Sequence, residues 1–229
     1  MMGTLAARFG APLLVLIFGL LAGGALAWWS APTSLDGDTF TKASKAQTPR
    51  VVAFAPAKDN TPGFPSPKSG DFSLIDQNGE PRSSKDPDGR YQLVFFGYAK
   101  CKAICSVALP NMAQATDLLT GLGHTVTPVL VTVDPKRDTV AALKTAAPKM
   151  HPRMMGLTGT VPNLEAAYDA FGITKTFVFD HPEEGAVYTH GSMIYLLGPD
   201  GGFKTLFPPI TNPVRIAELV AAYIAESAG

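Results

Sequence analysis

The sequence contains few cysteines and carries no net charge. The 229 residues include only two cysteines, so the chain can form at most one internal disulfide. The 19 basic and 19 acidic side chains balance, which gives no electrostatic reason to expect nucleic acid as a partner. Charged residues make up only 17% of the chain, which is low for a cytosolic enzyme, while the 46% hydrophobic content is ample for one domain with a core.

Charge is absent altogether from residues 10–29. A helix of this length, at about 1.5 Å per residue, just spans a hydrocarbon core of about 30 Å, and Trp28 and Trp29 would lie at the membrane interface. We therefore expect a transmembrane anchor, preceded by a short cytoplasmic N-terminus at residues 1–9. The alternative is a cleaved signal peptide, because Ala25-Leu26-Ala27 has the form of a cleavage site. Both interpretations predict a domain that is exported across a membrane.

A single arginine, Arg8, precedes this run, which argues against a mitochondrial transit peptide and favours a bacterial envelope protein. We expect a single-pass protein of the bacterial inner membrane with its C-terminal domain in the periplasm. Residues 30–69 are rich in proline, a composition that cannot bury enough apolar surface to fold alone and that predicts an extended periplasmic linker. The folded domain is expected over residues 70–229.

Strands and helices are expected to alternate through this domain. Hydrophobic runs predict strands at residues 91–97, 126–133, 176–179 and 193–197, and turn signals predict hairpins at 71–79 and 193–207. Periodicity and caps predict helices from about Leu109 to Leu119, from Asp138 to Ala147, from Thr160 to Gly172 and from Asn212 to Ile224. A βαβ unit followed by a hairpin and a closing helix predicts an α/β, thioredoxin-like fold, with a central mixed sheet flanked by helices.

The two cysteines, Cys101 and Cys105, stand between the strand predicted at residues 91–97 and the helix that follows it. In α/β sheets, ligands and reactive groups gather at such strand ends. Positions i and i+4 of a helical turn hold their Cβ atoms about 5–6 Å apart, whereas a disulfide needs about 3.5–4.5 Å, so a metal fits this spacing more readily. Two thiolates select Cu(I), zinc or an iron–sulfur cluster. The helix dipole and Lys102 favour the thiolate form.

Other readings of these residues remain open at the level of the sequence. A structural disulfide and a catalytic redox pair are alternatives for the cysteines. Copper or zinc needs further ligands, and His190 is the best placed of the four histidines, but spacing alone does not distinguish a ligand from a hydrogen-bonded histidine. The segment Met150-His-Pro-Arg-Met-Met155 offers donors for an auxiliary Cu(I) site, although packing is the favoured role of its methionines. Met193 could face either the core or the metal.

Four segments resemble the SCO/SenC family in order and spacing, from about Asp71 to Ile224. They are Phe96-Gly-Tyr-Ala-Lys-Cys-Lys-Ala-Ile-Cys105, Val131-Thr-Val-Asp-Pro-Lys-Arg-Asp-Thr139, Gly156-Leu-Thr-Gly159, and His190 with Gly198-Pro-Asp-Gly201. Members of this family are membrane-anchored, thioredoxin-like copper proteins that help to assemble the binuclear copper A centre of cytochrome c oxidase. The resemblance implies that Cys101, Cys105 and His190 are the copper ligands and that Asp134 is a nearby acidic residue of functional interest.

The sequence departs from the family pattern around the cysteines. The family usually reads Cys-Pro-x-x-Cys-Pro with an acidic residue between the cysteines, whereas here Lys102 and Ser106 replace the prolines and Ala103 stands in the middle. The histidine is often preceded by aspartate, and here it follows Thr189. The three ligand positions are intact, so copper binding is expected to survive, while the lysine could shift redox behaviour or partner choice.

We therefore expect a membrane-tethered metallochaperone rather than an enzyme. It would bind copper, as Cu(I) and also as Cu(II), and deliver it to the cytochrome c oxidase subunit that carries the copper A site. Other periplasmic copper chaperones or thiol reductases are further expected partners. The alternative is a periplasmic thiol–disulfide oxidoreductase, with Cys101 and Cys105 as its redox pair, that reduces the cysteines of a copper-site target. A peroxiredoxin-like peroxidase shares the fold but would not require His190.

Overall fold

The computed structural model describes residues 67–86, 88–183 and 185–227. The anchor predicted at residues 10–29 and nearly all of the linker predicted at residues 30–69 lie outside the described residues. Among the helices that are described, none combines the length and the apolar character needed to cross a membrane.

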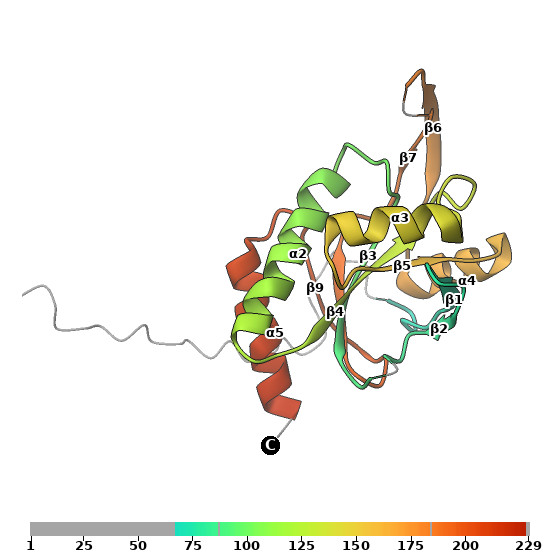
Figure 1. The fold of residues 1–229 in the computed structure, drawn as a ribbon. Helices are drawn as coiled ribbons and strands as arrows, with labels where there is room; N and C mark the ends of the chain where they lie inside the picture. Colours follow the sequence, from blue (N-terminus) through green and yellow to red (C-terminus); the bar gives the residue numbers. More distant parts are fainter. Residues whose placement is uncertain (1–66, 87, 184, 228–229) are drawn as a thin grey trace, which may run out of the picture. The chain divides into compact units, whose positions relative to one another are not determined.

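One seven-stranded mixed sheet forms the centre of the described domain (Figure 1), in the order β2-β1-β5-β4-β3-β8-β9. Its strands are β1 (Ser73–Asp76), β2 (Pro81–Ser83), β3 (Tyr91–Gly97), β4 (Val126–Thr132), β5 (Met155–Thr158), β8 (Ile194–Leu197) and β9 (Phe203–Phe207). The three central strands β3, β4 and β5 are parallel, and the outer strands pair antiparallel. Because parallel strands share a direction, the carboxyl ends of β3, β4 and β5 meet at one edge of the sheet.

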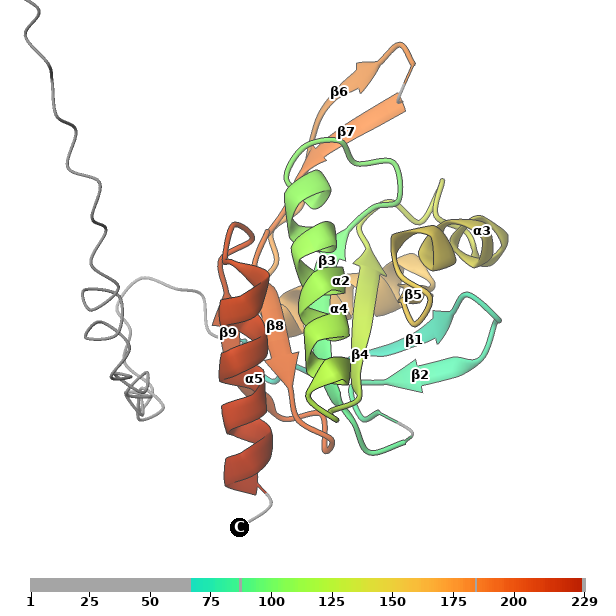
Figure 2. The ribbon, with the colours of Figure 1, turned by 60° about the vertical axis from the view of Figure 1, so that its left-hand side comes forward.

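Helices cover both faces of this sheet (Figure 2). The helices α2 (Cys105–Gly121), α3 (Val140–Met150) and α5 (Pro213–Ser227) lie on one face, and α4 (Val161–Phe171) lies on the other. Successive residues of β3 alternate between the two buried clusters: Phe95 packs with α2 and α5, while Phe96 packs with α4. Both faces of β3 are therefore buried, which explains its uninterrupted apolar sequence. The predicted α/β class, with a mixed sheet flanked by helices, is confirmed.

The ends of α4 and α5 follow the signals in the sequence. The Thr160 side chain accepts a hydrogen bond from the Asn163 N–H and caps α4, which ends at Gly172 with a left-handed φ of 66°. The Asn212 side chain accepts a hydrogen bond from the Val214 N–H at the start of α5. These ends were predictable because each depends on groups within a few residues.

The predicted cap of α3 is wrong. Thr139, and not Asp138, caps this helix by accepting a hydrogen bond from the Ala142 N–H. The Asp138 carboxylate is buried and instead accepts hydrogen bonds from the Thr132 hydroxyl at 2.7 Å and from the Ala99 N–H at 3.0 Å. The Asp138 side chain, which was predicted to cap α3, therefore bonds Ala99 in a distant loop.

A two-stranded antiparallel ribbon projects from the domain (Figures 1 and 2). It consists of β6 (Thr176–His181) and β7 (Gly185–Thr189), which pair with each other and form a sheet of their own. The strand predicted at residues 176–179 is present, but it is longer than expected, and neither β7 nor β5 was predicted. His190 follows β7 directly, so the ribbon leads into the functional residues.

Candidate metal centre

The two cysteines come from the connection between β3 and α2. Cys105 is the first residue of α2, whereas Cys101 lies in the preceding loop, where its N–H donates to the Tyr98 carbonyl at 3.0 Å. The helix begins at Cys105, earlier than the start predicted near Leu109, and the helical spacing applied to the two cysteines is wrong because Cys101 lies outside the helix. Both cysteines are free thiols. The lack of a side chain at Gly97 allows the close approach of Cys105, since a Cβ atom there would lie 3.0 Å from its Sγ atom.

His190 reaches the cysteines from a distant part of the chain. Its Nε2 atom lies 3.7 Å from the Cys105 Sγ atom, and one donor atom from each of Cys101, Cys105 and His190 lies within 4.8 Å of the others. The Nδ1 atom of His190 lies 2.9 Å from the Gly191 carbonyl. Because a carbonyl only accepts hydrogen bonds, Nδ1 carries a proton, and Nε2 faces the sulfurs. The three residues selected from the sequence thus form one group of donor atoms that could hold a metal ion.

The two thiols differ strongly in acidity. The hydrogen bond from Cys105 lowers the pKa of Cys101 to about 4 against the opposing effect of burial, and contacts with His190 and the backbone N–H groups of Cys105 and Ala103 lower it further. For Cys105, the same hydrogen bond, burial and the Cys101 charge all raise the pKa. At neutral pH the pair therefore holds a thiolate on the half-buried Cys101 and a proton on the buried Cys105.

Tyr98 lies beside a cysteine sulfur and the histidine ring of the donor group. Burial and the Cys101 charge raise the pKa of Tyr98 to about 12, so its hydroxyl keeps its proton and donates to the Cys101 sulfur. Its ring meets the His190 ring edge-on, with the centroids 6.1 Å apart, and Phe95 meets the same imidazole at 6.0 Å. Sequence reasoning missed Tyr98 as a functional residue. Its position directly after Gly97, in the segment that carries the cysteines, was the available signal.

Asp134 is buried near the centre but is not a member of the donor group. Its carboxylate forms an ion pair with Arg137, whose guanidinium carbon lies 5.4 Å from the centroid of the Tyr98 ring. Asp134 is therefore connected to the donor group through the side chains of Arg137 and Tyr98. Arg137 was also missed, although it belongs to the segment 131–139 that resembles the family pattern.

The residues of the segment Met150–Met155 have packing or hydrogen-bond partners in the described structure. Four methionines pack against the buried core clusters: Met150, Met154, Met155 and Met193. Both ring nitrogens of His151 are occupied, since Nδ1 accepts a hydrogen bond from the Arg153 N–H and Nε2 lies 3.1 Å from the Asp117 carboxylate. The packing interpretation of these residues agrees with the structure.

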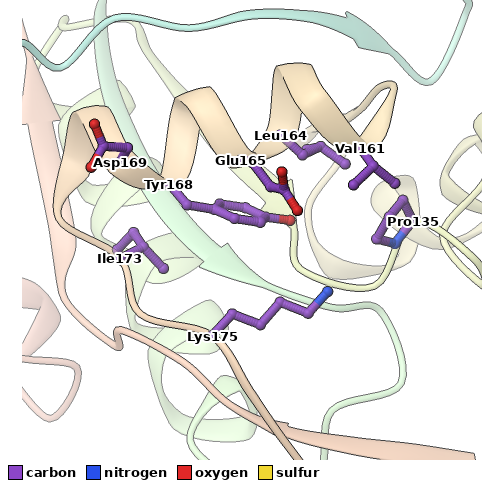
Figure 3. A pocket seen from close by; sticks show the side chains of 8 residues that line it. All are labelled: Pro135, Val161, Leu164, Glu165, Tyr168, Asp169, Ile173 and Lys175. Carbon is purple, nitrogen blue, oxygen red and sulfur yellow. The ribbon is translucent and has the colours of Figure 1, made fainter.

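A cavity of about 450 Å³ lies along α4 and is separate from the donor group (Figure 3). In Figure 3 the Lys175 side chain extends along the cavity toward Pro135, with Glu165 and Tyr168 of α4 beside it. The Tyr168 hydroxyl donates to the Thr132 carbonyl at 2.7 Å, which fixes one wall. Neither cysteine nor His190 lines this cavity. Within the donor group, Cys105 is buried, whereas Cys101 and His190 are half-buried.

Comparison with known proteins identifies the family of this chain. A family model described as SCO1/SenC matches residues 60–225, which is most of the chain. The chain belongs to the SCO1/SenC family.

Within this family, protein SenC of Rhodobacter capsulatus is 32% identical over 172 residues, covering 75% of this chain and 77% of that relative. The crystal structure of Arabidopsis thaliana ScoI with copper bound is similar with a TM-score of 0.64 and 26% identity, covering 69% of this chain and 99% of that chain. BsSco is similar with a TM-score of 0.53 and 25% identity, covering 72% of this chain and 95% of that chain. BsSco is described as a member of the Sco family of cytochrome c oxidase assembly proteins with a disulfide switch.

Proposed function

We propose that this SCO1/SenC protein binds one copper ion through Cys101, Cys105 and His190 and delivers it to the copper A site of cytochrome c oxidase. The observation that carries the proposal is the convergence of two sulfurs and one imidazole nitrogen within 4.8 Å. Thiolate sulfur is a soft donor that favours Cu(I), and imidazole suits copper in either oxidation state. The copper-bound structure of a similar protein supports copper over zinc as the ion.

The different burial of the donors suggests how copper leaves. Cys105 is only 1% exposed, whereas Cys101 and His190 are half-buried, so an incoming partner thiolate approaches on the side of Cys101 and His190. That thiolate forms a copper–sulfur bond while the bond to the His190 Nε2 atom breaks. A second donor of the partner then replaces Cys101 on the copper, and a further partner donor replaces the buried Cys105 last, which completes the transfer. No step changes the oxidation state of the copper.

The split acidity of the cysteines also affects copper uptake. The low pKa of Cys101, caused first by the hydrogen bond from Cys105, provides one thiolate without loss of a proton at neutral pH. Cys105 must lose a proton before its sulfur can bind copper. Copper binding near neutral pH is therefore expected to release a proton from Cys105.

A thiol–disulfide oxidoreductase is the second candidate function. A half-buried thiolate next to a buried, protonated thiol is the arrangement of an attacking and a resolving cysteine. The Cys101 thiolate would attack a disulfide of the target, and Cys105 would then resolve the mixed disulfide and release two target thiols. The disulfide switch described for BsSco supports this alternative. Unlike copper transfer, this reaction does not need His190.

We further propose that the domain acts from the periplasmic side of the bacterial inner membrane, tethered by residues 10–29 through the linker at residues 30–69. The uncharged run in the sequence supports this location. The partners of this arrangement are the oxidase subunit that carries the copper A site and other periplasmic copper chaperones or thiol reductases.

Anaerobic titration of the purified full-length protein with Cu(I), and a parallel titration with Cu(II), tests the copper site. We expect one copper per chain, loss of binding in Cys101→Ser and in Cys105→Ser, and markedly weaker binding in His190→Ala. His124→Ala, which removes a histidine outside the donor group, is the matched control and should bind as the wild type does. Unchanged stoichiometry and affinity in His190→Ala would overturn the ligand assignment.

A further inference from the structure

Arg137 joins three parts of the structure that surround the donor group. It lies in the loop between β4 and α3, where its Nε atom forms an ion pair with Asp134. Its Nη2 atom donates a hydrogen bond to the Ala186 carbonyl of β7. Its guanidinium carbon lies 5.4 Å from the centroid of the Tyr98 ring, which is within the range of a cation–π contact.

The loop that carries Arg137 is fixed against the loop that carries Cys101. The Asp138 carboxylate accepts hydrogen bonds from the Thr132 hydroxyl at 2.7 Å and from the Ala99 N–H at 3.0 Å. The same Thr132 oxygen accepts a hydrogen bond from the Asp134 N–H at 2.9 Å. Because Ala99 stands two residues before Cys101, these bonds hold the start of the Arg137 loop at a defined place relative to that cysteine.

The ribbon of β6 and β7 is packed less closely against the rest of the domain than the Arg137 loop is. It forms no strand pairing with the seven-stranded sheet, and all of the described side chains of its two strands are exposed or half-buried. A cavity of about 440 Å³ opens between the ribbon and the Arg137 loop, lined by Asp134 and Arg137 on one side and by Phe177 and Tyr188 on the other. The guanidinium spans this gap, and it lies so close to Gly185 that a Cβ atom there would be 2.7 Å from its Nη1 atom.

We propose that Arg137, held by Asp134, is a positioning residue for His190. The ribbon ends at Thr189, so its placement determines where the next residue enters the donor group. The Tyr98 ring under the guanidinium meets the His190 ring edge-on, and its hydroxyl donates to the Cys101 sulfur. One arginine therefore orients both the ribbon that delivers the imidazole and the ring that contacts it. This inference rests on the proposed copper site, in which His190 is the third ligand.

The substitution Arg137→Gln tests this role in the full-length protein. It removes the ion pair with Asp134, the guanidinium hydrogen bond to the Ala186 carbonyl and the contact with Tyr98. We expect copper affinity to fall about 10–100-fold, the typical effect of losing a group that orients a ligand. In the metal-free protein, amide hydrogen exchange should become faster over residues 185–191. Asp134→Asn should have the same effects. Lys136→Gln removes a neighbouring charge from the same cavity and should change neither quantity.

The His190→Ala background separates positioning from a general effect on the fold. If Arg137 acts through His190, adding Arg137→Gln to His190→Ala should cause no further loss of copper affinity. An equal loss in both backgrounds overturns the inference, as does unchanged affinity or unchanged hydrogen exchange in Arg137→Gln. Wild-type affinity in His190→Ala alone would instead overturn the copper site on which the inference rests.

Discussion

The Nε2 atom of His190 lies 3.7 Å from the Sγ atom of Cys105, although the two residues are 85 positions apart in the sequence. Strand pairing explains this contact. β8 runs antiparallel to β3, with Ile194 opposite Phe95, so the residues that precede β8 lie beyond the carboxyl end of β3. That is the end at which the chain turns into the cysteine loop. The sheet, and not the spacing of the residues, brings the imidazole to the two sulfurs.

The Cys101 thiol should react as a thiolate far below the usual pH range of cysteine. Because its pKa is lowered to about 4 from an ordinary value of 9.0, alkylation by iodoacetamide should persist as the pH falls to about 4 and stop below it. Mass spectrometry of the alkylated protein should locate the label on Cys101 and not on Cys105. Cys105→Ala removes the main hydrogen-bond donor and should raise the midpoint, while Cys105→Ser keeps an O–H donor and serves as the control. Identical profiles for wild type and Cys105→Ala would contradict this electrostatic account.

The Tyr98 hydroxyl should stabilise the same thiolate. Tyr98→Phe removes the O–H donor and keeps the ring, and a hydrogen bond to a charged group contributes about 1.5–3 kcal/mol. The midpoint of Cys101 alkylation should therefore rise by about one to two pH units. Tyr91→Phe makes the same chemical change at a hydroxyl that bonds Tyr223 and Ser227 instead, and should leave the midpoint unchanged. A Tyr98→Phe profile that overlays the wild type would show that this hydroxyl does not act on Cys101.

The uncharged run at residues 10–29 should keep the full-length protein in the membrane fraction. A helix that spans the bilayer resists extraction by high salt and by carbonate, because its retention depends on apolar contact rather than on charge. Protease added to the periplasmic side should reach the C-terminal domain. N-terminal sequencing provides the decisive control, since a mature chain that begins at Trp28 would mean that Ala27 ends a cleaved signal peptide.

The parts of the fold that depend on neighbouring residues could be predicted from the sequence. The apolar run of β3 and the caps Thr160 and Asn212 correspond to elements of the structure at nearly the expected positions. The same local reasoning failed for Asp138, because its carboxylate bonds Ala99 in another loop. It failed again at Cys101, which lies in a turn closed by the Tyr98 carbonyl and not in a helical turn with Cys105.

The donor residues of the candidate site could be predicted from the sequence, but the residues around them could not. Cys101 and Cys105 are the two cysteines of the sequence and could be selected by their chemistry, whereas His190 was selected among four histidines through the resemblance to the SCO/SenC family. Tyr98 and Arg137 act by their contacts, and the hydrogen bond from Arg137 to the Ala186 carbonyl requires the ribbon of β6 and β7 to lie beside the Arg137 loop. The sequence contains no period or turn signal that predicts this placement.

The most direct test of the account is whether a bacterial strain carrying His190→Ala can assemble cytochrome c oxidase. Copper transfer needs the imidazole as a ligand, whereas disulfide exchange by Cys101 and Cys105 does not. Strains carrying His190→Ala, Cys101→Ser, Cys105→Ser or a deletion should be compared with the wild type for oxidase activity and copper A content, with and without added copper. The account predicts that His190→Ala behaves like the deletion and is partly rescued by copper. Normal assembly in His190→Ala, with failure in either cysteine variant, would contradict it and identify the protein as a thiol reductase.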